Sequence, residues 1–298
     1  SSFSGLIVPI AIGSVSDTNI LRKICSDLYG SLWSSHFAIR PAKLFDGVEQ
    51  RLTILIGCHG PSDGNWYTSK YHQWFSEERS ELFSKIILVS MPPRLSEESP
   101  WPKIGSVTEA RILEKLRIFE GSPTHLLLTD SSKWVMYFHR TPGYWIRMLD
   151  FLPFFESPAG DRSVHHIREL YATSEAARAE IAGLGSSSLY FWWFFAIGNC
   201  RNLTKGDLLG FPAPRLDAGG AVEIVRIFNE LMKSYKDNSS VKSRAKARYQ
   251  EFDWVAAKPS VDAMDEFFAK VFGLTDEELD FVINYDIKVR VGDVAEGI

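Results

Sequence analysis

Cysteine is scarce in this chain. The three cysteines, Cys25, Cys58 and Cys200, are far apart, odd in number, and none belongs to a Cys-x-x-Cys pair. This usage excludes a disulfide framework and favours a reducing compartment. We therefore expect a cytoplasmic protein.

Long apolar runs are also missing. The most apolar stretch, 189–197, is about half of the roughly 18 residues that a membrane helix needs, so it predicts a buried helix. No basic region precedes the apolar residues at the N-terminus, which argues against a signal peptide. The apolar run begins almost at once, and we expect Ser1 to follow a cut within a domain.

Motifs for metals and nucleotides are absent too. Cys58 and His59 are adjacent, as are His165 and His166, which is not the spacing that places two ligands on one helix face. The sequence has no Walker loop and no glycine-rich turn after an early strand. We expect neither a metal site nor a cofactor-binding motif in this chain.

An excess of positive charge is lacking, since the net charge is −4. Residues 1–104 carry 10 basic and 10 acidic groups, residues 105–215 carry 12 and 11, and residues 216–298 carry 11 and 16. The acidic excess lies in the last part, and the rest is close to neutral. Such a balance permits a local basic face for nucleic acid without requiring one.

The 298 residues are 45% hydrophobic and 13% aromatic, which suffices for two domains or one large one. The run 5–12 is continuously apolar and predicts a strand buried on both faces, as in a parallel sheet. A helix over 18–30 and strands near 33–39 and 52–56 follow. Residues 1–60 therefore predict strand, helix, strand and strand, the end of an α/β sheet.

Prolines between 92 and 102 mark the best domain boundary. Beyond it we expect a capped helix to about residue 119, a short-stranded sheet over 124–155, and helices over 173–184 and 187–197 broken by Gly183 and Gly185. Further helices are expected over 219–235 and 261–284, the latter with a capping box at Thr275–Glu278. The domains predicted are 1–104, 105–215 and 216–298.

Several segments resemble one protein family. The strand Gly5-Leu6-Ile7-Val8-Pro9, the aromatic segment 139–155, the Ser186–Pro214 stretch and the helix Thr275-Asp276-Glu277-Glu278-Leu279-Asp280 are similar to parts of type IIG adenine-specific DNA methyltransferases. The likeness is strongest in 5–56, 139–155, 186–214 and 274–290. It implies the C-terminal part of a Rossmann-like methyltransferase sheet, then an α+β target-recognition domain with a helical tail.

The resemblance implies a base pocket near Phe45. In the family a phenylalanine at this place shares the pocket of the flipped adenine, and an aromatic ring is a surface on which any base can stack. Phe45 is thus the candidate catalytic residue, and Lys43 beside it a candidate DNA contact. From spacing alone, Phe45 is instead a core residue at a strand end.

The segment 139–147 supplies most of the DNA-binding candidates, namely His139, Arg140, Tyr144 and Arg147. These residue types contact phosphates and base edges. The alternative is an edge strand with its aromatics in the core and its arginines in solvent. Arg201 and Asn202 are added from a similar turn in the family.

Two further segments have open interpretations. The helix start Ser186–Ser188 could hold a phosphate on its free N–H groups, or it could be purely structural. The basic run Lys242-Ser243-Arg244-Ala245-Lys246-Ala247-Arg248 could track a DNA backbone, or it could be a solvated helix face.

The family's catalytic Asn-Pro-Pro-Tyr loop is absent, since Met91-Pro92-Pro93-Arg94 lacks both flanking residues. The resemblance therefore implies that an N-terminal part outside this chain binds S-adenosylmethionine, and that this fragment alone is inactive. The partners expected are double-stranded DNA and that part, in restriction–modification or a related phage defence. The alternative is a stand-alone, non-enzymatic DNA specificity subunit.

Overall fold

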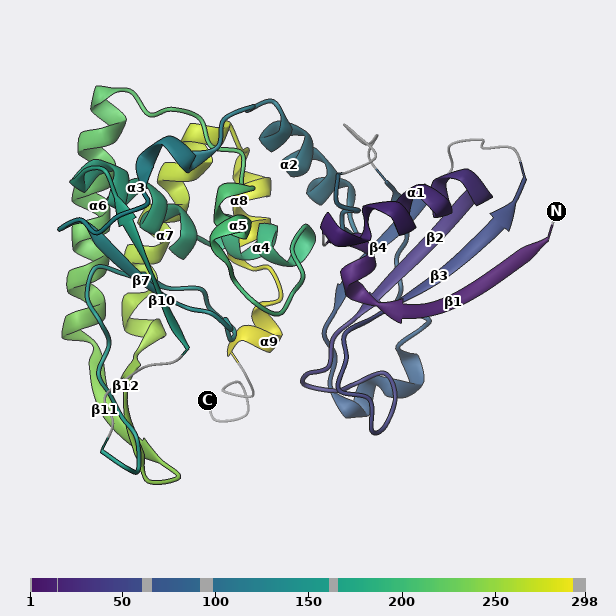
Figure 1. The fold of residues 1–298 in the computed structure, drawn as a ribbon, viewed down its shortest axis with the longest axis horizontal. Helices are drawn as coiled ribbons and strands as arrows, with labels where there is room; N and C mark the ends of the chain where they lie inside the picture. The colour runs from purple at the N-terminus through teal and green to yellow at the C-terminus, as the bar shows by residue number, and fades with distance from the viewer. Residues whose placement is uncertain (1, 15, 61–65, 92–98, 161–165, 292–298) are drawn as a thin grey trace. The chain divides into compact units, whose positions relative to one another are not determined.

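A computed structural model describes the chain except residues 1, 15, 61–65, 92–98, 161–165 and 292–298. It divides into two compact units (Figure 1). Unit 1 comprises Ser1–Glu114, Trp193–Cys200 and Asp286–Ile298, and unit 2 comprises Lys115–Trp192 and Arg201–Tyr285. The predicted boundary at residues 92–102 lies mostly outside the described residues, and the three predicted domains remain predictions.

Unit 1 is built on a five-stranded sheet of order β1-β3-β2-β4-β5. Its elements are β1 (Phe3–Pro9), the 3₁₀ turns η1 (Ile10–Gly13) and η2 (Ser16–Thr18), α1 (Asn19–Leu28), β2 (Tyr29–Phe37), β3 (Leu52–His59), β4 (Trp66–His72), η3 (Ser76–Glu81) and β5 (Val89–Ser90). β3 is antiparallel to both β1 and β2, so β1 and β2 run in the same direction. The predicted order of strand, helix, strand and strand is confirmed.

The predicted environment of the first strand is wrong. β1 pairs only with β3 among the described residues, in antiparallel register, and most of its side chains are exposed. The prediction failed because a continuous apolar run indicates that both faces avoid water, and it cannot distinguish a covered strand from an apolar edge.

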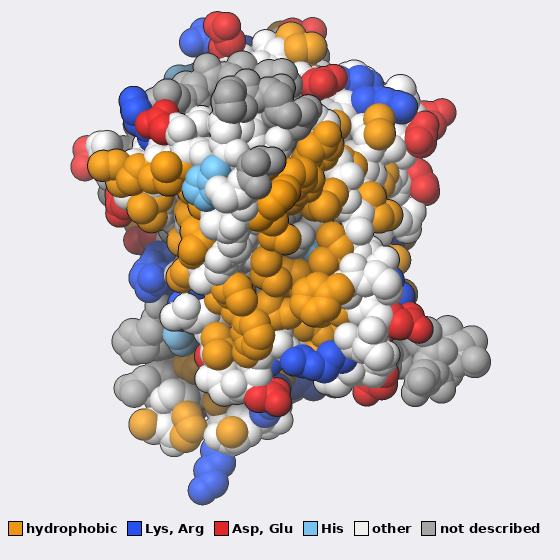
Figure 2. Space-filling model, turned by 90° about the vertical axis from the view of Figure 1, so that its right-hand side faces the viewer, with side chains coloured by type: hydrophobic (Ala, Val, Ile, Leu, Met, Phe, Trp, Pro, Cys, Tyr) orange, Lys and Arg blue, Asp and Glu red, His pale blue; other side chains and the backbone are white. Residues whose placement is uncertain are grey.

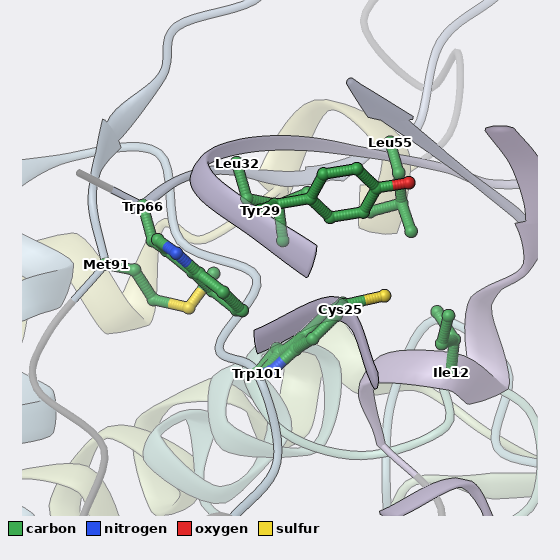
Figure 3. Packing of buried hydrophobic residues seen from close by; sticks show 8 residues of the cluster. All are labelled: Ile12, Cys25, Tyr29, Leu32, Leu55, Trp66, Met91 and Trp101. Carbon is green, nitrogen blue, oxygen red and sulfur yellow. The ribbon is translucent and has the colours of Figure 1, made fainter. Parts of the chain in front are cut away.

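A buried cluster fills the space between α1 and the sheet (Figure 3). Tyr29 lies above Cys25 of α1, and the rings of Trp66 and Trp101 meet edge to face at 5.5 Å. The members are Ile12, Cys25, Tyr29, Leu32, Leu55, Trp66, Met91 and Trp101. A second cluster around Phe37 and Trp74 supports the other end of the sheet.

Several polar side chains are buried inside this sheet, and His36 lies among them. The His36 ring is within hydrogen-bond distance of Thr53 Oγ1 at 2.9 Å and of Thr68 Oγ1 at 3.1 Å. Burial, followed by the charges of Lys103 and His72, lowers the pKa of His36 far below 6.5. The imidazole is therefore neutral, and it joins three strands through polar contacts that water does not reach.

Unit 2 contains a sheet of order β6-β10-β7-β8, helices that pack on it, and a smaller sheet of order β11-β12-β9. The strands are β6 (Leu127–Leu128), β7 (Val135–His139), β8 (Met148–Leu149), β9 (Phe155–Glu156), β10 (Ile167–Ala172), β11 (Ser239–Arg244) and β12 (Ala247–Phe252). The helices that follow β5 along the chain, of which α9 and most of α2 belong to unit 1, are α2 (Val107–Arg117), η4 (Pro123–Leu126), α3 (Glu175–Ser186), α4 (Ser188–Ala196), α5 (Lys205–Leu209), α6 (Ala218–Asp237), α7 (Trp254–Phe272), α8 (Asp276–Ile283) and α9 (Ile287–Val291).

Three local predictions need correction. Gly183 and Gly185 lie inside α3, which ends at Ser186. The helix predicted over 261–284 is two helices, because Gly273 adopts a left-handed conformation after α7. The basic run 242–248 is not a helix face but the outer part of the β11–β12 hairpin. The capping box at Thr275 is confirmed.

Candidate nucleic-acid interface

The loop between β7 and β8 forms the first candidate site. β7 pairs with β8 so that Phe138 lies opposite Met148, and the next position of this register brings His139 opposite Arg147. The loop encloses a cavity of about 210 Å³. Its lining residues are His139, Thr141, Pro142, Gly143, Trp145, Ile146 and Arg147.

The two ends of the loop differ in charge. Partial burial, then the positive charge of Arg147, then His166, lowers the pKa of His139, so its imidazole is neutral at pH 7 although its outer side is exposed. The Arg147 guanidinium lies 5.4 Å from the ring centroid of Phe252. The cavity therefore offers one cation backed by an aromatic ring, and one neutral group that can donate or accept a hydrogen bond.

An aromatic stack holds this loop. The Trp145 and Trp254 rings are stacked at 5.0 Å with an interplanar angle of 18°. Ile146 is buried, whereas Tyr144 is 46% exposed. The loop is thus anchored at Trp145 and Ile146 and presents Tyr144 to solvent.

The turn that follows Cys200 joins the same loop. The Leu203 N–H donates to the carbonyl oxygen of Arg140 at 2.6 Å, and Thr141 Oγ1 donates to Asn202 Oδ1 at 3.4 Å. The structure therefore brings Arg140 and Asn202 together, with Arg201 next in the chain. Both arginines are exposed. Of the predicted DNA contacts, all except Lys43 gather here.

Lys43 lies instead in unit 1, beside a cavity of about 510 Å³. Arg79 donates hydrogen bonds to the carbonyl oxygens of Lys43 at 3.1 Å and Leu44 at 2.9 Å, which fixes the loop. Lys43 Nζ contacts Glu49 at 2.6 Å, and this contact lowers the pKa of Glu49. The lining residues are Ile39, Arg40, Pro41, Ala42, Lys43, Asp46, Glu49, Ser76 and Arg79.

Phe45 stands at the surface of this loop. It is 39% exposed, whereas its neighbour Leu44 is 5% exposed and belongs to the core cluster around Phe37 and Trp74. The loop therefore buries Leu44 and leaves part of the Phe45 ring accessible. Its role at a flipped base remains a prediction.

The helix start at Ser186–Ser188 is occupied by protein. All three serines are at most 5% exposed, and the carboxylate of Asp265 accepts a hydrogen bond from the Ser188 N–H at 2.7 Å. A phosphate would have to displace a buried carboxylate, so the structural interpretation holds. Sequence reasoning missed Asp265 because nothing in the sequence pairs two residues this far apart.

A bare apolar surface lies on unit 1. Figure 2 shows a band of hydrophobic side chains on the side where Figure 1 places β1, β3 and α1. The exposed members are Phe3, Leu6, Ile7, Ile20, Leu21, Ile24, Leu28 and Ile56, each at least 45% exposed. An amphipathic helix normally turns its apolar stripe inward, so the outward stripe on α1 is unusual for a surface in water.

The described residues contain no group of three or more His, Cys, Asp and Glu side chains that could hold a metal ion. In the same part of the chain, no helix combines the length and apolarity needed to cross a bilayer. Sequence reasoning counted Trp145 among the aromatics of the segment 139–147, but it did not place Trp145 or Thr141 in the set of DNA contacts. The aromatic density of 144–155 was the only available signal for Trp145, and Thr141 had none.

Comparison with known proteins gives a likeness of fold. No protein-family model and no curated protein sequence matches this chain. The solved structure of the type IIL restriction–modification enzyme MmeI in complex with DNA matches with a TM-score of 0.51 and 10% identity, over 97% of this chain and 49% of that one. This chain thus spans about half the length of MmeI, and its fold is similar to that of part of a restriction–modification enzyme.

Proposed function

We propose that this chain is part of a site-specific DNA methyltransferase of a restriction–modification or related phage-defence system. Such an enzyme moves a methyl group from S-adenosylmethionine to the amino group of an adenine flipped out of the duplex, and we place it in the cytoplasm. The observation that carries the proposal is the fold likeness to MmeI over 97% of the chain. The resemblance of 5–56 and 139–155 to adenine methyltransferases supports the same function.

Unit 1 would supply one wall of the base pocket. A flipped base loses its stacking in the duplex, and an accessible aromatic ring replaces part of it. Phe45 has this accessibility, because the loop buries Leu44 in its place. Arg40, Lys43 and Arg79 line the neighbouring cavity and could hold the phosphates that flank the base.

Unit 2 would read the DNA sequence. The loop 139–147 presents cations with fixed backbones, since Arg140 is tied to Leu203 and Arg147 rests on Phe252. An arginine held in this way can contact a guanine edge or a phosphate. Neutral His139 suits a base edge better than a phosphate, because it can accept as well as donate.

Neither of the two cavities described above fits the methyl donor. The cavity at 139–147 has no carboxylate for a ribose, and its volume is below the usual range for cofactor pockets, about 300–1,000 Å³. The cavity at 39–49 is lined by three cations and two carboxylates, an unfavourable surrounding for a positively charged sulfonium. We propose that a catalytic part outside this chain binds the cofactor.

The apolar surface of unit 1 supports such a catalytic part. β1 has an unpaired outer edge among the described residues, and β1 and β2 run parallel with β3 reversed between them. Large sheets of doubly wound folds often mix parallel and antiparallel strands, and in this sheet β3 and β5 are the antiparallel ones. We propose that further strands of a Rossmann-like sheet continue from β1 and that their helices cover the exposed residues. A stand-alone specificity subunit would leave this surface in water.

Substitution of Phe45 in the intact protein tests the proposal. Loss of stacking worth about 1–3 kcal/mol should reduce DNA methylation by about one to two orders of magnitude in Phe45→Ala. Phe45→Tyr, which keeps an aromatic face, should retain much more activity. Methylation is measured by transfer of a labelled methyl group to duplex DNA.

The matched control is Phe83→Ala, because Phe83 is a 60% exposed phenylalanine of the same unit outside the loop. This variant should methylate DNA normally. Absence of any S-adenosylmethionine-dependent methylation by the intact wild-type protein would contradict the proposed function. Lower melting temperature with normal turnover in Phe45→Ala would instead make Phe45 a structural residue.

A further inference from the structure

The β11–β12 hairpin, here called the ribbon, is joined by β9 at Arg248 and Tyr249 and carries a concentrated positive charge. Residues 239–252 include four basic residues and one acidic residue, whereas the whole chain has a net charge of −4. Its register runs from Ser239 opposite Phe252 to Arg244 opposite Ala247. Figure 1 shows the ribbon extending from the ends of α6 and α7.

The turn of the ribbon has a defined geometry. Ala245 and Lys246 both have positive φ, at 49° and 66°, as the central residues of a type I′ turn require. Non-glycine residues rarely adopt this conformation. Lys246 is thereby fixed at the tip, where it is exposed.

The two faces of the ribbon have different surroundings. Paired residues share a face, so Ser239, Phe252 and Arg248 lie on one side. This side contacts the rest of unit 2, since the Phe252 ring lies 5.6 Å from Tyr235 of α6. On the same side, the Arg248 guanidinium lies 3.0 Å from a Glu156 oxygen of the neighbouring strand β9. This side is the inner face.

Lys242 and Arg244 lie on the opposite, outer face together with Tyr249. Both cations are exposed, and neither has an ion-pair partner within the described part of the chain. Lys242 and Arg244 are two positions apart along β11, a distance of about 7 Å. The outer face thus presents two free cations in a row, with Lys246 beyond them at the tip and Glu251 on the same face at the opposite end, opposite Ser240.

The ribbon shares its base with the loop 139–147. Phe252 at the end of β12 lies under the Arg147 guanidinium, and Trp254 just beyond it stacks on Trp145. The loop and the ribbon are therefore fixed to each other by direct packing within unit 2. A DNA molecule bound at the loop extends along the protein in both directions and carries about one negative charge per 1.7 Å of its axis.

We infer that the outer face of β11–β12 binds the phosphate backbone of double-stranded DNA, through Lys242, Arg244 and Lys246. This inference rests on the proposed function, because it takes duplex DNA as the partner. The contact strengthens binding to any sequence and does not select the target, since it engages phosphates rather than base edges. Arg248 takes no part, because its guanidinium is held by Glu156 on the inner face.

The test measures the affinity of the intact protein for a short fluorescent duplex of random sequence, by anisotropy over a series of salt concentrations. Removing two phosphate contacts should lower the slope of log affinity against log salt by about 2. Lys242→Gln/Arg244→Gln should accordingly bind about tenfold or more weakly at low salt, and the difference from wild type should shrink as salt rises. Its melting temperature should match that of wild type.

Two control variants also remove positive charge, but from other surfaces. Arg248→Gln removes a cation from the inner face of the same ribbon, and Lys233→Gln/Lys270→Gln removes two exposed cations from helices of unit 2. Both should keep nearly the wild-type slope. An equal effect of Arg248→Gln or of the helix variant would overturn the assignment to the outer face.

The remaining outcomes separate the inference from the function on which it rests. Weaker binding in Arg140→Ala with an unchanged Lys242→Gln/Arg244→Gln variant refutes the ribbon contact and leaves the loop in place. A wild-type protein that binds no duplex refutes both. Tighter binding to single-stranded RNA or to phosphatidylserine vesicles than to the duplex overturns the choice of partner.

Discussion

Asp265 is a buried carboxylate on α7 that caps a different helix. It is 2% exposed and accepts the Ser188 N–H at 2.7 Å, at the first residue of α4. A hydrogen bond to a charged group contributes about 1.5–3 kcal/mol, and a buried N–H without an acceptor costs about 1–3 kcal/mol. Because burial of the carboxylate is itself unfavourable, we expect Asp265→Ala to lower the free energy of unfolding by about 2–3 kcal/mol.

Urea denaturation followed by far-ultraviolet circular dichroism measures this loss. With a denaturant slope of about 3 kcal/mol per molar, the midpoint of the transition should fall by about 1 M. Asp265→Asn keeps an acceptor oxygen without the charge, so it should lose about half as much. The control is Asp262→Ala on the same helix, whose partly exposed pair with Lys258 is worth about 0.5 kcal/mol. Unchanged or increased stability of Asp265→Ala would show that burying the carboxylate costs more than its cap contributes.

Three further predictions concern unit 1. Burial lowers the pKa of His72 from 6.5 to about 4. As the pH falls from about 6.5 to 4, the unfolded chain therefore binds a proton at this histidine and the folded chain does not. Stability present above pH 6.5 should be lost over this window, by up to about 3 kcal/mol, and His72→Phe should flatten the dependence in urea titrations. Gly57→Ala should lower the melting temperature, because a Cβ at this position meets the Tyr29 ring, at a cost of about 1–3 kcal/mol; Tyr29→Leu in the same chain should relieve part of it. Residues 1–298 alone should self-associate in analytical ultracentrifugation through the exposed side of α1, and Ile24→Lys should reduce this; a monodisperse wild-type monomer would argue against the uncovered surface.

Local sequence patterns predicted much of the secondary structure. They did not predict which distant segments pair with each other. The capping box at Thr275 was identified because its partner is three residues away. The hairpin at 239–252 was missed because lysine, arginine and alanine favour helices, and its turn has no glycine or asparagine to signal positive φ.

The same limit applies to the candidate site, where local sequence was informative and long-range pairing was not predicted. Sequence similarity selected the segment 139–147, but only the β7–β8 register places His139 opposite Arg147. The link from Arg140 to Leu203 joins two turns that are distant in the chain. The predicted domains 1–104 and 105–215 already separated Lys43 from the other candidates, and Lys43 lies in unit 1.

The eight residues 193–200 belong to unit 1, although the chain on both sides of them belongs to unit 2. Phe195 of this segment stacks on Tyr71 at 5.4 Å, and Lys103 Nζ donates to the carbonyl oxygen of Gly198 at 2.9 Å. Genetic exchange of a continuous stretch from 115 to 285 would therefore import foreign residues into the core of the recipient's first unit. A designed chimera that exchanges unit 2 therefore needs two grafts, 115–192 and 201–285, with the recipient's own 193–200 between them.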